Sequence, residues 1–173
     1  MTCYTRYVQD EQHYAEVLSL VSHVKRTLWI GTADIKDLYI KKDSVVIPFL
    51  GLLSSLIESK VEIRLIHAKE PGTNFRNDFD KYPLLASQLE RVLCPRVHFK
   101  LFIFDMQTAY IGSANLTGAG IGMKGEFTRN FESGILTNEP DLVNAAINQF
   151  DAVWMGSFCQ KCKRKDFCQD RIG

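Results

Sequence analysis

The sequence predicts a single α/β domain whose sheet is parallel in part. The chain has 173 residues, of which 46% are hydrophobic and 24% are charged. This length and composition are typical of a globular domain that buries its own core. Helical and strand-like patterns alternate along the first half of the chain, and that order is typical of an α/β sandwich that contains parallel strands.

Two helices and two strands are predicted in the first half of the chain. Apolar residues at helical spacing predict an amphipathic helix over residues 11–25, and residues 28–31 are expected to form the first strand. Pro48 suits the first turn of a second helix, and residues 61–67 are expected to form the second strand. The apolar stripe of the second helix consists of Phe49, Leu52, Leu53, Leu56 and Ile57.

A loop and a short helix are predicted to follow. Residues 70–81 contain proline, glycine, asparagine and aspartate, which favour a loop. Residues 84–92 are predicted to form a short helix that ends before Pro95, because proline interrupts the helical hydrogen bonds.

The second half of the chain predicts a hairpin, one more strand and a final helix. The hairpin pairs residues 97–104, whose aromatic and branched side chains suit a buried strand, with residues 108–111. Residues 131–136 are expected to form a further strand. Asn138 is a candidate N-cap for a helix that runs to Trp154.

The predicted hairpin contains the residues with the clearest chemical signal. His98, Lys100 and Asp105 have the spacing H-x-K-x-x-x-x-D, and Gly112-Ser113-Ala114-Asn115 follows. Residues two apart on a strand project from the same face, so His98 and Lys100 are expected to lie together. An imidazole beside a fixed positive charge suits attack on a phosphodiester. Asp105 is an odd number of residues from His98 and Lys100, so on a regular strand its side chain points to the opposite face (the opposite parity). We therefore expect Asp105 to support the hairpin or the neighbouring chain.

Each of these residues also has a purely structural interpretation. A lone histidine in an apolar strand usually bonds to the backbone. Here Lys100 shares the face of His98, and a buried lysine is costly unless it serves a partner or an anion, which favours a catalytic role. The glycine-rich stretch after the hairpin is either a flexible turn or a means to bring Ser113 and Asn115 close to phosphate oxygens.

The spacing of His98, Lys100 and Asp105, followed by Gly112-Ser113-x-Asn115, resembles the signature (HKD motif) of the phospholipase D superfamily. The likeness is closest to its small single-motif members, which are phosphodiesterases and nucleases. It implies an α/β/α sandwich with a mixed sheet. It also implies that the catalytic residues are His98, Lys100, Asp105, Ser113, Asn115 and Glu132. In this resemblance, Glu132 holds the far ring nitrogen of His98 and fixes its tautomer.

The same resemblance implies a metal-independent reaction through a phosphohistidine, with two copies of the motif in each site. The chain has one copy, so we expect a homodimer that shares one active site. The leading hypothesis is an endonuclease acting on DNA or RNA. The alternatives are a phospholipase D-type lipid phosphodiesterase and a non-catalytic nucleic-acid-binding or scaffold module.

The cysteines suggest a separate structural site. Cys159-x-x-Cys162-x5-Cys168 offers three thiolates at close spacing, and a structural zinc ion needs four ligands. Cys94 is the best candidate for the fourth ligand, and Cys3 is the second. An iron–sulfur cluster uses the same ligands. Free surface thiols and an oxidised pair are the other interpretations.

We expect residues 1–156 to form the phospholipase D-like catalytic domain and residues 157–173 to form a Cys-rich tail packed on it.

The sequence also bears on location and partners. The first 15 residues lack the apolar core of a signal peptide, and five cysteines is an odd number, so a reducing, cytoplasmic location is expected. The longest apolar run, residues 45–57, is too short to cross a bilayer, so no membrane partner is expected. The net charge of +1 leaves nucleic-acid binding to local basic patches.

Overall fold

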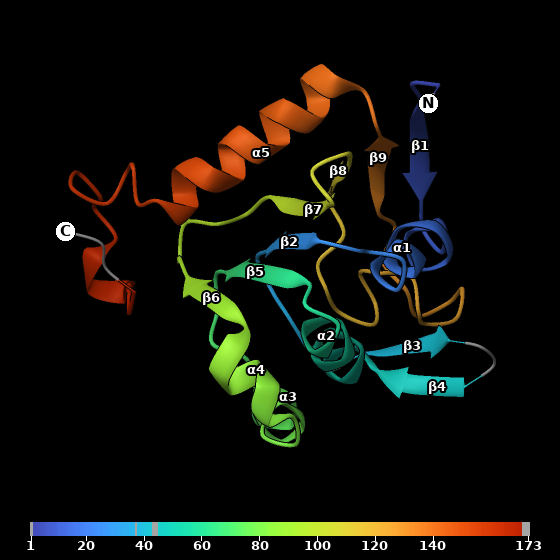
Figure 1. The fold of residues 1–173 in the computed structure, drawn as a ribbon, viewed down its shortest axis with the longest axis horizontal. Helices are drawn as coiled ribbons and strands as arrows, with labels where there is room; N and C mark the ends of the chain where they lie inside the picture. Colours follow the sequence, from blue (N-terminus) through green and yellow to red (C-terminus); the bar gives the residue numbers. More distant parts are fainter. Residues whose placement is uncertain (1, 37, 43–44, 171–173) are drawn as a thin grey trace.

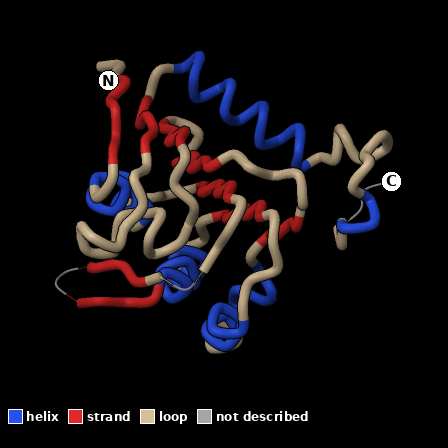
Figure 2. Tube along the Cα trace, turned by 180° about the vertical axis from the view of Figure 1, so that it is seen from behind, coloured by secondary structure: helices blue, strands red, loops and turns tan. Residues whose placement is uncertain are grey.

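A seven-stranded sheet forms the centre of the molecule in the computed structural model, which describes residues 2–36, 38–42 and 45–170. The strand order is β1-β9-β8-β7-β2-β5-β6, and helices cover both faces of the sheet (Figures 1 and 2). A two-stranded ribbon of β3 (Tyr39–Lys42) and β4 (Val45–Pro48) forms a second, separate sheet. The predicted α/β/α sandwich with a mixed sheet is confirmed.

The sheet is parallel on one side and antiparallel on the other. Its strands are β1 (Thr5–Gln9), β2 (Thr27–Thr32), β5 (Glu62–His67), β6 (Glu90–Leu93), β7 (Lys100–Phe104), β8 (Thr108–Gly112) and β9 (Ser133–Thr137). Strands β2, β5 and β6 are parallel, whereas β7, β8, β9 and β1 join by antiparallel pairing. The parallel component expected from the alternation of helices and strands is therefore present.

Seven helical elements surround this sheet. They are the π-helical turn η1 (His13–Leu18), α1 (Ser19–Val21), α2 (Phe49–Glu58), α3 (Thr73–Phe79), α4 (Pro83–Gln88), α5 (Pro140–Trp154) and the 3-10 turn η2 (Lys165–Phe167), among the residues that the structure describes. The predicted apolar stripe of α2 is buried throughout. The first predicted helix is shorter than residues 11–25 and begins as a π-helix.

Strand β7 lies at the middle of the sheet and is buried on both faces. Phe102 and Phe104 belong to the apolar cluster that contains α1 and α2, whereas Leu101 and Ile103 belong to the cluster beneath α5. Successive side chains of a strand point to opposite faces, so a strand covered on both sides is continuously apolar. This burial explains why residues 101–104 were predictable as a strand.

The face beneath α5 is held by stacked aromatic rings. Phe150 is fully buried, and its ring centroid lies 4.9 Å from Trp29 of β2 and 6.0 Å from Trp154. The Arg64 guanidinium lies 5.0 Å from the centroids of both tryptophan rings. Helix α5 is thereby fixed over the central strands.

The segment predicted as a loop over residues 70–81 contains helix α3, so that prediction was wrong. Phe75 is buried, and its ring stacks on Phe79 at 6.2 Å. Gly72, with an extended backbone, precedes the helix and lets the chain enter it. Burial of Phe75, with the partly buried Phe79 stacked on it, outweighs the local preference of this polar segment for a loop.

The predicted helix over residues 84–92 was wrong in its second half. Helix α4 starts at Pro83 and ends at Gln88, and Glu90–Leu93 forms the edge strand β6 beside β5. Short apolar runs do not distinguish a helix from a strand by periodicity alone. The available edge of β5 decides the outcome here, because it supplies backbone hydrogen-bond partners.

Three predicted boundaries also need correction. Strand β9 begins at Ser133, and Phe131, predicted to lie in it, is 94% exposed. Strand β7 begins at Lys100, three residues after its predicted start. The N-cap of α5 is Glu139, whereas the Asn138 side chain accepts a hydrogen bond from the Tyr4 amide at 2.7 Å and so ties β1 to this corner.

Truncation of Phe150 tests the aromatic packing beneath α5. Phe150→Ala is expected to lower the free energy of unfolding by about 3–5 kcal/mol, because it leaves a cavity between two tryptophan rings. The control is Val46→Ala, which truncates a side chain that is 63% exposed and should change stability by less than about 0.5 kcal/mol. Urea denaturation measures both values, and similar losses for the two variants would contradict this description of the core.

Candidate active site

The antiparallel pairing of β7 with β8 brings the two parts of the predicted motif together. Lys100, the first residue of β7, pairs with Gly112, the last residue of β8. The residues just before β7 and just after β8 therefore meet at the same end of the two strands. His98 lies on one side of this junction, and Ser113 and Asn115 lie on the other.

His98 and Lys100 lie side by side, as their spacing predicts. The Lys100 ammonium donates a hydrogen bond to the His98 carbonyl oxygen at 2.7 Å, and its Nζ lies 3.2 Å from His98 Nδ1. His98 is exposed, whereas Lys100 is only 5% exposed. His98 precedes the strand, so the contact comes from the local course of residues 97–99 and not from strand parity alone.

The path of the chain at His98 depends on a glycine in β2. The Phe99 ring lies directly over Gly31, where any Cβ atom would overlap it. Gly31 pairs with Leu101 of β7, so the ring crosses the neighbouring strand at close range. Sequence reasoning missed this role of Gly31, because the glycine and the ring that needs it are far apart in the chain.

Burial controls the charge of Lys100. Loss of hydration lowers the pKa of Lys100 from its ordinary value, and the negative charge of Glu132 acts in the opposite direction. An anion placed beside the ammonium would favour the charged form further. The site therefore contains a cation whose surroundings favour a negatively charged ligand.

Glu132 bonds to residues on the β8 side of the site. Its carboxylate accepts hydrogen bonds from the Ser113 hydroxyl and, at 3.0 Å, from the Asn130 side chain. Among the residues that the structure describes, no hydrogen bond joins Glu132 to His98. Both carboxylate oxygens have donors on the β8 side of the site, and the bond from Glu132 to the far ring nitrogen of His98 stays a prediction.

Ser113 and Glu132 form one polar unit at the end of β8. The Ser113 hydroxyl accepts a hydrogen bond from the Ser133 amide at 3.0 Å while it donates to Glu132. The Ser113 amide donates to the Ser133 carbonyl at 2.9 Å. These contacts fix the loop after β8 against the start of β9.

Asn115 connects this loop to the end of β2. Its side-chain oxygen accepts hydrogen bonds from the Asp34 amide at 3.1 Å and from the Thr32 hydroxyl at 3.4 Å. The Thr32 hydroxyl in turn accepts from the Leu116 amide at 3.1 Å. Because the side-chain oxygen of Asn115 already accepts these hydrogen bonds, its side-chain nitrogen is the part that can donate to a ligand.

A cavity of about 350 Å³ begins beside Asp34. It is lined by Asp34, Ile35, Lys36 and residues 72–75.

Tyr110 supports the same loop from below. It is fully buried, and its hydroxyl accepts a hydrogen bond from the Ala114 amide at 3.3 Å. A Cβ atom on Gly112 or Gly134 would overlap the tyrosine side chain. Burial raises the pKa of Tyr110 well above its usual range, so the hydroxyl stays protonated. The glycines next to the motif thus make room for a buried ring, which sequence reasoning did not foresee.

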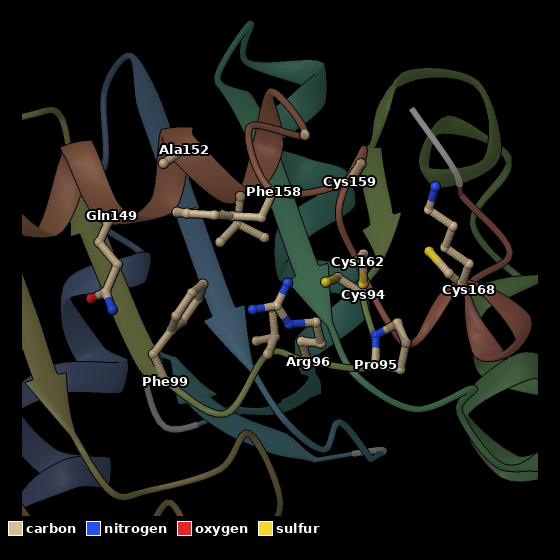
Figure 3. Close-up of a pocket in the computed structure, with 14 residues that line it drawn as sticks. Cys94, Pro95, Arg96, Phe99, Gln149, Ala152, Phe158, Cys159, Cys162 and Cys168 are labelled. Carbon is tan, nitrogen blue, oxygen red and sulfur yellow. The ribbon is translucent and has the colours of Figure 1, made fainter. Parts of the chain in front are cut away.

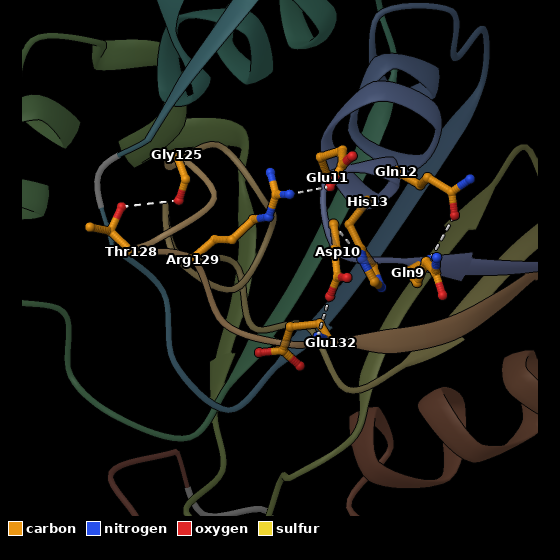
Figure 4. Close-up of polar contacts among 9 residues, drawn as sticks. All are labelled: Gln9, Asp10, Glu11, Gln12, His13, Gly125, Thr128, Arg129 and Glu132. Atoms are coloured by element: carbon orange, nitrogen blue, oxygen red, sulfur yellow. Dashed lines mark hydrogen bonds and ion pairs between the residues drawn. The ribbon is translucent and has the colours of Figure 1, made fainter.

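The turn after β1 fixes Glu132 from the other side. The Asp10 amide donates to the Glu132 carbonyl at 3.1 Å, and the Glu132 amide donates to the Asp10 carboxylate at 3.2 Å (Figure 4). Arg129 forms an ion pair with Glu11 at 2.6 Å. The long segment that joins Asn115 to Glu132 is therefore anchored on the N-terminal turn.

Asp105 lies at the opposite end of β7 from Lys100, roughly 17 Å away along the strand. Its carboxylate accepts hydrogen bonds from three consecutive backbone amides, those of Lys25, Arg26 and Thr27, at 3.0, 2.7 and 3.0 Å. Asp105 thus fixes the start of β2 and cannot touch a ligand beside His98 in the same chain. The expectation from its parity, a supporting role, agrees with this position.

The remaining histidines have structural positions. His13 and His67 are buried, and the Nδ1 atom of each lies within hydrogen-bond distance of a backbone carbonyl, at 2.9 and 2.7 Å. Burial lowers the pKa of His67. His23 is exposed. These three histidines therefore serve as packing or surface residues.

The structure gathers four of the five cysteines at another place. Cys94, Cys159, Cys162 and Cys168 line a cavity of about 310 Å³ at the end of α5 (Figure 3). Cys3 lies before β1, at the far edge of the sheet from β6 and Cys94. Within the described residues, no three or more His, Cys, Asp or Glu side chains already form a coordination group.

Comparison with known families agrees with this geometry. Residues 17–154 match the family described as "Cardiolipin synthase, PLD-like domain". Because the match covers most of the chain, the chain belongs to the phospholipase D-like superfamily of phosphodiesterases. A comparison with curated proteins finds no match.

Among the described residues, no helix is both long enough and apolar enough to cross a membrane.

Solved structures of two bacterial proteins share the fold over almost their whole length. Nuc from Salmonella typhimurium, a phospholipase D family member, has a TM-score of 0.62 at 17% identity and covers 88% of this chain and 95% of its own. NucT from Helicobacter pylori has a TM-score of 0.63 at 12% identity, with 87% and 96% covered. Phosphatidylserine synthase from Haemophilus influenzae has a TM-score of 0.59 at 14% identity, with 87% of this chain but 38% of its own covered.

The role of Asp105 generates a prediction about stability and pH. Burial acts to raise the pKa of Asp105, but the amides of Thr27, Arg26 and Lys25 outweigh it, and the pKa lies below its ordinary value. A lowered pKa stabilises the fold fully above the unfolded-state value of about 3.9. That stabilisation is lost as the pH falls through the folded-state pKa. Asp105→Asn should therefore cost roughly 1–2 kcal/mol at neutral pH.

The difference in unfolding free energy between wild type and Asp105→Asn should shrink below about pH 4. Urea denaturation over a pH series measures it. The control is Glu126→Gln, which neutralises an exposed carboxylate and should leave stability unchanged at each pH. A difference for Asp105→Asn that stays constant down to low pH would contradict this role.

Proposed function

We propose that the protein is a metal-independent nuclease that cleaves DNA or RNA through a phosphohistidine on His98, in an active site shared by two copies of the chain. The observation that carries the proposal is the exposed imidazole of His98 beside the buried ammonium of Lys100, at 3.2 Å. An exposed nucleophile next to a shielded cation suits a phosphodiester, because the cation offsets charge on phosphoryl oxygens.

The reaction begins with attack by His98. Nδ1 lies toward Lys100, so Nε2 is the other ring nitrogen, and it can attack phosphorus in the tautomer that carries the ring proton on Nδ1. A nitrogen–phosphorus bond forms, the ester bond breaks, and the leaving alkoxide takes a proton from a second histidine. Water then attacks the phosphohistidine and gives its proton to that second histidine, which restores both rings.

The other residues of the motif stabilise charge and geometry. The Lys100 ammonium and the free amide nitrogen of Asn115 would donate to phosphoryl oxygens as negative charge builds in the transition state. The Ser113 hydroxyl, fixed by Ser133 and Glu132, would hold the loop that presents Asn115. Asp105 would position β2 and would not touch the phosphate.

The need for a second histidine supports a homodimer. The full H-x-K-x-x-x-x-D motif occurs once in the chain, at His98, Lys100 and Asp105, and a twofold axis would supply the other copy from the same surface. Each carboxylate oxygen of Glu132 can accept a second hydrogen bond, so Glu132 would then be available to the partner's imidazole. Phe127 and Phe131, 96% and 94% exposed, lie in the segment before Glu132, and a second subunit would cover them.

Size and surface favour nucleic acid over a lipid substrate. Nuc and NucT correspond to this chain over 95% and 96% of their lengths, whereas the chain spans 38% of the phosphatidylserine synthase. Lys36 and Lys124 are exposed on the segments that bond to Leu116 and Gly118, just after Asn115. Exposed cations beside the motif would attract a nucleic-acid backbone.

Cleavage without a catalytic metal is the first expected result. The protein should cut single- or double-stranded DNA or RNA in EDTA, and His98→Ala should lower the rate by at least about 10³-fold, because it removes both the nucleophile and the acid of each dimer. The control, His23→Ala, changes an exposed histidine outside the site and should keep the wild-type rate.

The same variants, incubated with phospholipid vesicles, distinguish the lipid alternative. Headgroup release that depends on His98, with no cleavage of nucleic acid, would replace the nuclease proposal by a lipid phosphodiesterase. Binding of nucleic acid with no turnover of either substrate would identify a non-catalytic module. Cleavage that requires added Mg²⁺ would contradict the proposed chemistry.

Mixed dimers test whether the site is shared. Wild-type and His98→Ala subunits are mixed in varying ratio, unfolded and refolded together. A shared site predicts that activity falls with the square of the wild-type fraction, because every mixed dimer lacks one histidine. Activity proportional to the wild-type fraction would mean independent sites. Mixtures of wild type with His23→Ala should keep full activity.

A further inference from the structure

We propose that Cys94, Cys159, Cys162 and Cys168 bind one structural zinc ion, which joins the C-terminal tail to the segment that leads to His98. All four are free thiols, partly shielded from solvent, and all four line one cavity of about 310 Å³ (Figure 3). Four thiolates are a complete ligand set for a closed, tetrahedral zinc site.

The tail has almost nothing else to hold its structure. In residues 157–170 the three cysteines are the only side chains that are not exposed, and the one regular element is the three-residue turn η2. A segment of this size cannot bury a core of its own, and a structural metal is a common substitute for one. The tail nevertheless adopts a defined path against the domain.

That path brings the tail to the end of β6. The Asp170 carboxylate accepts a hydrogen bond from the Leu93 amide at 2.7 Å, and the Cys168 sulfur lies 3.9 Å from the Leu93 carbonyl oxygen. Cys94 is the next residue along the chain. Hydrogen bonds on both polar groups of Leu93 thus place the last cysteine of the tail beside Cys94.

The surroundings suit thiolates bound to a metal. Cys159 and Cys162 lie in one turn, in which the Cys162 amide donates to the Cys159 carbonyl at 3.1 Å. The Arg164 amide donates to the Cys162 sulfur at 3.4 Å, and such second-shell donors stabilise metal-bound ligands. Four thiolates carry more negative charge than one zinc ion neutralises. Arg96 and Lys165 lie close enough to Cys162 to interact with it electrostatically.

The fold also decides which cysteine can complete the set. Cys3 precedes β1, and β1 and β6 are the two edges of the seven-stranded sheet. Six strand spacings separate these edges, roughly 29 Å, so Cys3 cannot reach the tail that lies beyond β6 (Figure 1). Zinc binding has to draw the four sulfurs of the cavity together, since they do not yet form a coordination group among the described residues.

Such an ion would brace the active-site segment. Cys94 is four residues before His98, and the Val97 amide donates to the Cys94 carbonyl at 3.0 Å. The tail and the segment 94–98 would then be fixed to each other through the metal. This arrangement does not depend on which phosphodiester the protein cleaves.

Cobalt binding to the full-length protein tests the site directly. Reduced, metal-free protein titrated with Co²⁺ in the absence of air should bind one ion per chain and develop the strong thiolate-to-cobalt absorption of a tetrahedral tetrathiolate site. Added Zn²⁺ should abolish this absorption. Cys162→Ser and Cys94→Ser should each weaken Co²⁺ binding by roughly 100-fold or more.

The matched control is Cys3→Ser, which should bind Co²⁺ as the wild type does. Circular dichroism verifies that each variant is folded, and Cys162→Ser, in the exposed tail, carries the test if Cys94→Ser does not fold. The proposal is overturned if wild type binds no Co²⁺ through sulfur, or if Cys3→Ser weakens binding as much as Cys162→Ser. Purified protein that contains iron and acid-labile sulfide in place of zinc would also overturn it.

Discussion

The buried ammonium of Lys100 is the constraint on which the arrangement of the site depends. A lysine on a strand that is covered on both faces loses most of its hydration, and a buried charge is costly unless partners compensate it. The His98 carbonyl at 2.7 Å and the negative charge of Glu132 supply part of this compensation. A phosphate beside His98 would supply more, so the start of β7 is the place where an anion is most favourable.

The fold was predictable where burial makes the sequence periodic. Strand β7 and the apolar stripe of α2 are buried throughout, and the same patterns identify them in the sequence. Helix α3 and strand β6 were missed for the opposite reason. Both are short, and tertiary partners determine them: α3 through the buried ring of Phe75, and β6 through the open edge of β5. Local propensity carries no information about such partners.

The contacts within the candidate site were only partly predictable from the sequence. His98 and Lys100 lie together as their spacing predicts, although His98 precedes β7. Asp105 has a supporting role at the far end of β7, as expected. The contacts of Glu132 with Ser113 and Asn130, and the support of the loop by Tyr110, depend on chain crossings that no local pattern records. The two acidic residues therefore have different tasks: Asp105 fixes the start of β2, and Glu132 fixes the loop after β8.

The central claim is that His98 forms a covalent bond to phosphorus. Peptide mapping by mass spectrometry, on protein quenched at alkaline pH during turnover of a phosphodiester, tests it most directly, because phosphohistidine survives alkali. We predict a phosphoryl adduct on the peptide that contains His98, with the modification on the imidazole. Turnover with no adduct on the enzyme, or with the adduct on another residue, would contradict the account.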